Sequence, residues 1–194
     1  MLLLLLLLSS FCSLSAVAED PITNDRNDLL NPIFQGNLDG KGLRIAIVVS
    51  RFSGEPCQLL LDGALERLQE LGIKEQDIDV ASVPGAFEIP GTVKVIQRQK
   101  NHHAIITLGC VIRGETPHFD YIAGTCATAI AKLASKGKIP VIFGVLTTDD
   151  RDQAMARCGG DRGNKGRDSA DTAVEMATLY RSISETSVET EKEN

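Results

Sequence analysis

The chain has 194 residues and a net charge of −6, and 43% of its residues are hydrophobic but only 4% aromatic. This length allows one ordinary domain with an aliphatic core. The negative charge argues against nucleic acid as a partner, so an anion site would have to come from a few local cations and backbone N–H groups.

The first 30 residues are expected to precede the folded domain. Residues 1–18 contain a leucine run followed by Ala16-Val17-Ala18, which is typical of a signal or targeting segment with a small-residue cleavage site. Residues 19–30 are mostly polar and predict a linker. The leader predicts a plastid reached through a secretory-type route; the alternative is a cytoplasmic protein made from a later start codon. Because the apolar run is too short to span a bilayer, the mature form is expected not to be in a membrane.

Residues 31–35, NPIFQ, predict a short strand without a partner in its own sheet. Ile33 and Phe34 would then be exposed apolar side chains on a monomer. Adding this strand to the edge of a neighbouring subunit's sheet would bury them and satisfy the edge. The folded domain is accordingly expected to cover residues 31–183.

Strand and helix signals alternate from residue 43 onward. Apolar runs rich in β-branched residues predict strands buried on both faces, and apolar side chains at helical spacing predict helices between them. The predicted strands are 43–50, 77–83, 104–111 and 139–147. The predicted helices are 56–71, 86–99, 119–135, 150–158 and 167–183. This order predicts a three-layer αβα fold with an open, four-stranded parallel sheet, followed by a disordered acidic tail over residues 184–194.

The loops that follow the predicted strands are where a ligand is expected, because ligands of such sheets bind at the carboxyl ends of the strands. His118 lies in one of these loops. It is either a structural histidine satisfied by backbone groups or an acid/base group, and its position at a strand end favours the second interpretation. His102 and His103 precede a strand in a polar turn, so both are expected to be solvated.

Other residues at these strand ends have two interpretations each. Gly114-Glu115-Thr116 is either a phosphate cradle or an ordinary helix-capping turn. Phe52 and Phe143 either stack on a planar ring or fill the core. Glu88 either complements a helix dipole or accepts hydrogen bonds from a polyol. Arg157 belongs to a cationic stretch and could reach an anionic substrate from a neighbouring surface.

The five cysteines do not form a metal-binding pattern. They are Cys12, Cys57, Cys110, Cys126 and Cys158, and none of them belongs to a CxxC or CxH pair. A zinc site is therefore not expected. Cys110 and Cys126 are expected to be free, buried thiols.

Five motifs occur in order along the chain, and together they resemble those of the 6,7-dimethyl-8-ribityllumazine synthase family of riboflavin biosynthesis. They are SRF (50–52), VPGAFEIP (83–90), GCVIRGETPHFDYIAG (109–124), PVIFGVLTTDD (140–150) and GNKGRDSADTAVEMA (163–177). The resemblance covers residues 31–181. It implies a flavodoxin-like fold and the condensation of 5-amino-6-(D-ribitylamino)uracil with 3,4-dihydroxy-2-butanone 4-phosphate, with release of phosphate and water. It also implies that no metal or organic cofactor is needed.

The same resemblance implies a role for each matching residue. His118 matches the proton-transfer residue. The residues that match the pyrimidine and ribityl site are Phe52, Ala86, Phe87, Glu88, Cys110, Val111, Ile112 and Phe143. The residues that match the phosphate site are Glu115, Thr116, Arg157 and Lys165. In the family, Phe143 and Arg157 match residues that the adjacent subunit supplies.

This chain departs from the family pattern at three positions. Ser53 stands where the family often has Asn, Asp161 where many members have Lys, and Glu115 where some members have a small residue. Asp161 lowers the positive potential near the phosphate. A carboxylate at Glu115 is unfavourable beside a phosphate unless it points away.

The resemblance also implies a homo-oligomer with active sites shared between subunits. Pentamers are the expected minimum, and the short turn over 158–166 favours a shell of 60 subunits. Two other functions remain open, a non-catalytic lumazine or flavin carrier and a capsid-type assembly protein. A carrier would be expected to lose His118 or Arg157, and this chain keeps both.

Overall fold

The computed structural model describes residues 34–136 and 138–192, with residues 186–192 described by their backbone alone. The predicted leader and linker, and residues 31–33 of the predicted exchanged strand, lie outside the described residues. Phe34 and Gln35, the remaining part of that strand, are not in a strand here. Addition of this segment to a neighbour's sheet stays a prediction.

Four parallel strands form the central sheet, as the sequence predicted. The strands are β1 (Ile45–Ser50), β2 (Ile78–Val83), β3 (Ala104–Ile112) and β4 (Val141–Thr148), in the order β2-β1-β3-β4. All six residues of β1 are buried, as is β3 from Ala104 to Cys110. The continuous apolar runs of these two central strands follow from this, because helices cover both faces of the sheet.

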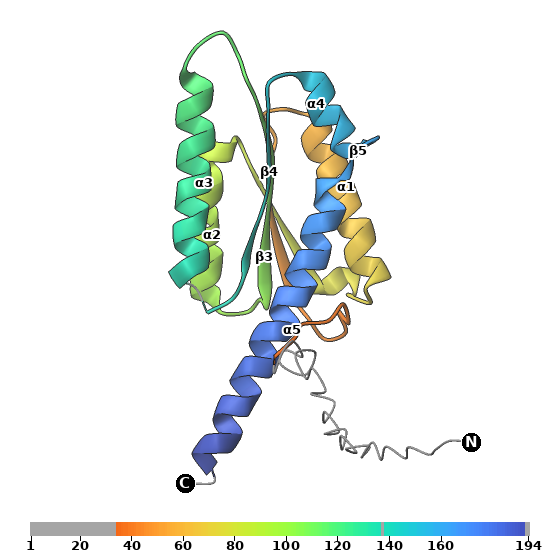
Figure 1. Cartoon of the computed structure of the whole chain (residues 1–194), viewed down its shortest axis with the longest axis vertical. Coiled ribbons are helices and arrows are strands. Elements are labelled where there is room, and N and C mark those ends of the chain that lie inside the picture. The colour runs from red at the N-terminus through yellow and green to blue at the C-terminus, as the bar shows by residue number, and fades with distance from the viewer. Residues whose placement is uncertain (1–33, 137, 193–194) are drawn as a thin grey trace, which may run out of the picture. The chain divides into compact units, whose positions relative to one another are not determined.

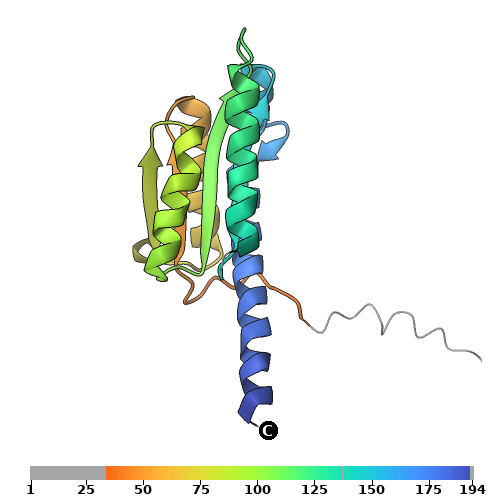
Figure 2. The same ribbon diagram turned by 90° about the vertical axis from the view of Figure 1, so that its left-hand side faces the viewer.

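Helices on both faces complete the predicted three-layer αβα arrangement (Figures 1 and 2). One face is covered by α1 (Glu55–Glu70), α4 (Arg151–Ala156) and α5 (Lys165–Lys192), and the other by α2 (Ile89–Gln99) and α3 (His118–Lys136). No helix in the described part of the chain is both long and apolar enough to cross a membrane.

Small residues let α5 lie close to its neighbours. Ala170, Ala173, Val174 and Ala177 of α5 are buried in the core cluster that contains β1 and β3. A side chain at Gly166 would overlap the carbonyl of Leu60 in α1. The small-residue face therefore packs as its composition indicates.

Short elements and helix ends differ from the sequence-based expectations. The predicted helix 86–99 is a 3-10 turn, η3 (Ala86–Glu88), followed by α2, since Pro90 suits only the first turn of an α-helix. A further 3-10 turn, η2 (Glu75–Asp77), and a hairpin of β5 (Cys158–Gly160) and β6 (Gly163–Asn164) were not predicted. In the hairpin, Gly159 and Gly163 adopt positive φ angles of 124° and 78°.

A disordered tail was predicted from residue 184, and the described part of that tail is residues 184–192. Helix α5 continues through them to Lys192. The segment is polar and acidic, but residues 168–192 contain neither glycine nor proline. Nothing in the local sequence therefore ends a helix that is already anchored on the sheet.

The amino ends of the strands hold a closed polar cluster, and the prediction that His102 is solvated is wrong. The His102 side chain is only 4% exposed, and its Nε2 lies 2.7 Å from Oδ2 of Asp79 at the start of β2. Arg44 donates to the same carboxylate oxygen at 2.9 Å. His103 is exposed, and its Nδ1 accepts the Arg44 backbone N–H at 2.8 Å. Sequence reasoning missed this cluster because Asp79 lies on a different strand.

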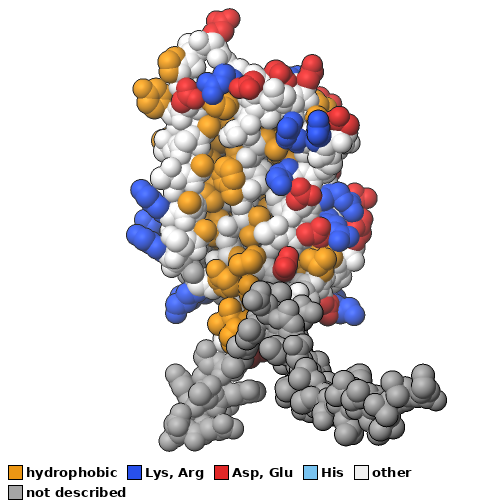
Figure 3. All heavy atoms as spheres, viewed as in Figure 1, with side chains coloured by type: hydrophobic (Ala, Val, Ile, Leu, Met, Phe, Trp, Pro, Cys, Tyr) orange, Lys and Arg blue, Asp and Glu red, His pale blue; other side chains and the backbone are white. Residues whose placement is uncertain are grey.

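One face of the molecule carries an apolar band along the free edge of the sheet. Figure 3 shows hydrophobic side chains gathered over β4, between α3 and α5, with charged side chains on either side. β4 is an edge strand, and Phe143 on it is 42% exposed. This edge has no partner strand among the described residues.

Candidate active site

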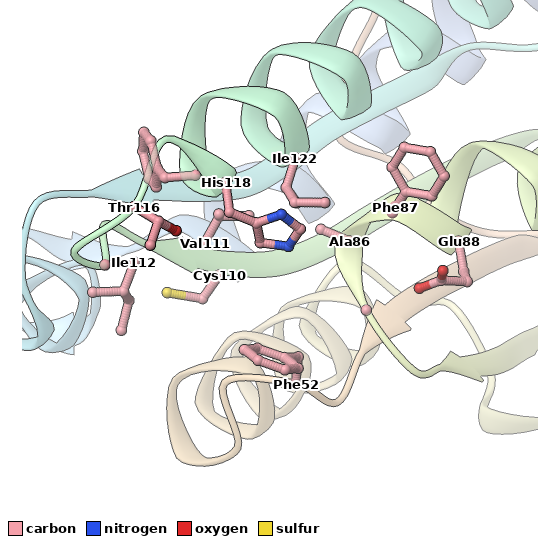
Figure 4. Close-up of a pocket in the computed structure, with 13 residues that line it drawn as sticks. Phe52, Ala86, Phe87, Glu88, Cys110, Val111, Ile112, Thr116, His118 and Ile122 are labelled. Carbon is pink, nitrogen blue, oxygen red and sulfur yellow. The ribbon is translucent and has the colours of Figure 1, made fainter.

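A cavity of about 410 Å³ lies where the carboxyl ends of the strands meet the start of α3. Phe52 reaches it from the loop after β1, and Ala86, Phe87 and Glu88 reach it from the turn after β2 (Figure 4). The loops converge there because parallel strands all end at the same edge of the sheet.

The third and central wall of the cavity comes from β3 and the segment after it. Cys110, Val111 and Ile112 line it at the end of β3, and Thr116 and His118 line it beyond. The residues predicted for the pyrimidine and for proton transfer therefore share one cavity, except for Phe143.

His118 is the first residue of α3, and its imidazole points into the cavity (Figure 4). The residue is exposed, and no hydrogen-bond partner for its ring is found among the described residues. Both ring nitrogens are thus available to a ligand. An imidazole in this situation can exchange a proton with a bound molecule.

Two exposed aromatic rings border the cavity. Phe52 is 87% exposed and Phe87 is 56% exposed, which excludes the core-filling interpretation for Phe52. Exposed phenyl rings beside an apolar cavity are typical of a binding surface, because a planar ligand that stacks on them removes their apolar surface from water.

The side chains of Ser53 and Cys110 at the floor of the cavity are not reactive groups. The Ser53 hydroxyl donates a hydrogen bond of 2.5 Å to the carbonyl of Cys110, which leaves the second lone pair of that oxygen for a ligand. Burial raises the pKa of the Cys110 thiol to about 12. This thiol therefore stays protonated and is not a nucleophile. All four described cysteines are free and buried, which confirms the prediction for Cys110 and Cys126.

Glu88 depends on a glycine for its place in the cavity wall. Its carboxylate lies against Gly85, where an added Cβ would be 3.0 Å from Oε2. A side chain at Gly85 would therefore require the carboxylate to shift by a few tenths of an ångström. Glu88 is exposed and can accept hydrogen bonds from a hydroxylated ligand.

The predicted phosphate loop is only partly in the cavity. Gly114 and Thr116 line it, whereas Glu115 between them is exposed and does not. The loop ends at the amino end of α3, where unpaired backbone N–H groups favour an anion.

Sequence reasoning missed Phe119 and Ile122 as lining residues. Both belong to the first turns of α3, and Ile122 follows His118 by four residues. That spacing places two side chains on one face of a helix, and it was the available signal.

The model of the 6,7-dimethyl-8-ribityllumazine synthase family matches residues 42–181. The chain belongs to this family. The four-stranded αβα fold agrees with the flavodoxin-like fold that the resemblance implied. Lumazine synthases act in riboflavin biosynthesis, so the family match indicates a transferase-type enzyme of that pathway.

The remaining residues predicted for the lumazine synthase site lie apart from the His118 cavity. Phe143 and Lys165 line a separate hollow of about 260 Å³ between β4 and the start of α5. The Lys165 ammonium is 3.1 Å from the Asp168 carboxylate. Arg157, just after α4, is exposed and donates to the Gln153 carbonyl at 3.0 Å. One protomer therefore does not bring these three residues to the cavity.

Metal binding was not predicted for this chain. Within the described residues, no three side chains of His, Cys, Asp or Glu converge on a point that could hold a metal ion. The three buried thiols on the α1 side of the sheet, Cys57, Cys110 and Cys158, belong to the apolar core cluster.

Proposed function

We propose that this member of the family catalyses the condensation of 5-amino-6-(D-ribitylamino)uracil with 3,4-dihydroxy-2-butanone 4-phosphate to 6,7-dimethyl-8-ribityllumazine. The observation that carries the proposal is the single cavity shared by His118, the exposed Phe52 ring and the Glu88 carboxylate. It offers a proton-transfer group, a stacking surface and a polyol acceptor within one space of about 410 Å³, on a chain that matches the family.

The pyrimidine is assigned to the β3 side of the cavity. Its ring stacks on Phe52, and its polar edges bond backbone groups of Cys110, Val111 and Ile112. Ala86 and Phe87 hold the ring from the opposite side, and Glu88 accepts hydrogen bonds from the ribityl hydroxyls. The apolar walls keep water away from the reacting amine, which strengthens each polar contact to the substrate.

The phosphorylated substrate is assigned to the loop at the amino end of α3. The Thr116 hydroxyl and the backbone N–H groups of Gly114 and Glu115 are its donors from one subunit. Arg157 and Lys165 of an adjacent subunit supply the positive charge. The exposed carboxylates of Glu115 and Asp161 lower the local potential, so phosphate affinity is expected to be below that of a chain without them.

His118 is assigned the proton transfers. The pyrimidine amine attacks the ketone, phosphate leaves, the new ring closes and water is lost. The amine has to give up a proton, and the leaving oxygen has to receive one, so a group that both accepts and donates is needed beside the reacting atoms.

A homo-oligomer with shared sites is part of the proposal. Phe143, Arg157 and Lys165 are exposed and separated from the cavity of their own protomer, and an apolar band follows the open edge at β4 (Figure 3). A pentamer is the expected unit, and a shell of 60 subunits is expected because the turn over 158–166 carries no insertion. Deletion of residues 1–37 should impair assembly and activity together; a fully active monomer in light scattering would contradict the shared site.

The test is to mix the two substrates with the protein and record the visible absorbance and fluorescence of the lumazine. His118→Ala is the active-site variant, and His103→Ala is the matched control, since it removes an exposed imidazole at the other end of the sheet. Product formation that depends on His118 and not on His103 supports the proposal. Tight binding of the lumazine without turnover would favour a carrier, and assembly without either would favour a capsid-type role.

A further inference from the structure

The guanidinium of Arg113 connects three segments around the proposed active site. The residue follows β3, and its backbone N–H donates to the Thr148 carbonyl at the end of β4, at 2.9 Å. Its Nε donates to Asp149 Oδ1 at 3.2 Å. Its Nη2 and Nη1 lie 3.2 Å and 3.4 Å from the two carboxylate oxygens of Asp120 in α3.

The same guanidinium also lies against an aromatic ring. Its central carbon is 4.1 Å from the centroid of the Phe119 ring, a cation–π distance. Phe119 and Asp120 are the two residues that directly follow His118 in the first turn of α3. Arg113 thus contacts α3 at the two residues next to His118, and its backbone is hydrogen-bonded to the end of β4.

Arg113 is not arranged as a ligand for phosphate. Its fork of donors is directed at the carboxylates of Asp120 and Asp149, which together offset its charge. The hydrogen bond to Asp120 is the main cause of a raised pKa of Arg113, so the residue stays charged. It is also absent from the lining of the cavity, although its neighbour Gly114 belongs to that lining.

A contribution to stability alone does not explain this arrangement well. The Arg113 side chain is 43% exposed and its partners Asp120 and Asp149 are 60% and 72% exposed. Ion pairs with this exposure add little to the free energy of folding. A planar, bidentate guanidinium does fix geometry, because it holds a carboxylate and a ring at set positions.

We propose that Arg113 is a positioning residue, which fixes the first turn of α3 and thereby the orientation of the His118 imidazole toward the bound substrates. This inference rests on the proposed function, because it assigns a role that is exerted through His118.

The experiment compares Arg113→Met with Arg44→Met in the full chain. Arg44 is a matched control: its side chain is also 43% exposed and it also pairs with a carboxylate, but at the amino end of the sheet. Arg113→Met should lower kcat by roughly 10- to 100-fold, the order expected for a misplaced catalytic group, with KM for both substrates nearly unchanged. Arg44→Met should leave kcat unchanged. Arg113→Lys should recover only part of the loss, because an ammonium lacks the fork.

A double variant separates positioning from a direct role. In a His118→Ala background, Arg113→Met should change kcat by less than about twofold, because two residues that act through one group are not additive. Full multiplication of the two losses would overturn the inference, and so would a rise in KM for the butanone phosphate with kcat unchanged.

Hydrogen–deuterium exchange gives a readout that does not depend on turnover. Arg113→Met should accelerate exchange in peptides that cover residues 114–123, and Arg44→Met should not. Unchanged exchange there would overturn the inference. A fully active His118→Ala variant would contradict the proposed function itself, which is a different outcome from an active Arg113→Met variant beside an impaired His118→Ala variant.

Discussion

The two ends of the central sheet carry the same three residue types in different arrangements. At the amino end, His102 is buried and bonded to Asp79, which also pairs with Arg44. At the carboxyl end, His118 is exposed in a cavity, and the nearby Asp120 is paired with Arg113 instead. A histidine whose ring is committed to a carboxylate supports the fold, whereas a histidine whose ring faces an open cavity is available for proton transfer.

This comparison explains why residue type alone was a poor guide. The sequence predicts both histidines in loops next to a strand, so their residue type and loop setting alone do not tell them apart. The direction of the parallel strands makes the difference, because it gathers every strand-to-helix loop at one end and leaves the other end to be closed by packing.

The largest expected effect on activity comes from removing the histidine at the carboxyl end of the sheet. His118→Ala should lower the rate of condensation by about 10²–10⁴-fold, the usual contribution of a positioned acid/base group. Residual turnover should remain because the two substrates are still held together. The rate is measured as lumazine formation across neutral pH, and circular dichroism checks that the fold is kept. Full activity of this variant would show that His118, like His102, has no role in proton transfer.

A smaller effect is expected from the cation that completes the carboxyl end from a neighbouring subunit. Arg157→Ala should weaken binding of the butanone phosphate by about ten- to a hundredfold, since a charge-assisted contact contributes roughly 1.5–3 kcal/mol. Affinity for the pyrimidine should change little. Isothermal titration with each substrate measures the two affinities separately, and an equal loss for both would argue against a phosphate role.

The amino end should respond in stability and not in rate. His102→Ala removes the buried partner of Asp79 and should lower the free energy of unfolding by roughly 1–2 kcal/mol, because Asp79 itself is half exposed. The value of kcat for the folded protein should stay as in the wild type. Urea unfolding together with the lumazine assay tests this pair of expectations, and a tenfold loss of kcat would contradict the structural role.

The smallest expected effects are changes in the free energy of unfolding at acidic pH. His103 is exposed by surface area, but the chain around its ring partly desolvates it, and this is the first cause that lowers the pKa of His103 from its ordinary 6.5, followed by the charge of Arg181. The hydrogen bond from His102 is the main cause that lowers the pKa of Asp79 from its ordinary 3.8. Both groups favour the deprotonated form in the folded state, so their contributions are present above those ordinary values and are lost as the pH falls through the lowered ones.

Stability should therefore decline in two steps as the solution is acidified. The first lies below pH 6.5 and the second below pH 3.8. Urea midpoints measured against pH should lose the first step in His103→Gln and the second in Asp79→Asn. A profile that both variants leave unchanged would show that the amino-end cluster does not control the acid response.

Much of the fold could be predicted from the sequence because it follows from the spacing of apolar residues that are close together in the chain. The apolar runs of β1 and β3 and the helical spacing of Leu61, Ala64, Leu65 and Leu68 in α1 predict their elements within a residue or two. The strand-end rule then placed His118, Phe52 and the turn after β2 at one edge, and the cavity does contain them.

What only the tertiary structure decided depends on contacts between residues far apart in the chain. Three features are of this kind. His102 pairs with Asp79, and Arg113 pairs with Asp120 and Asp149. Phe143 and Arg157 lie apart from the cavity. A sequence pattern reports the preferences of neighbours along the chain, whereas these contacts follow from strand order and register, which bring distant side chains together only when the whole sheet has formed.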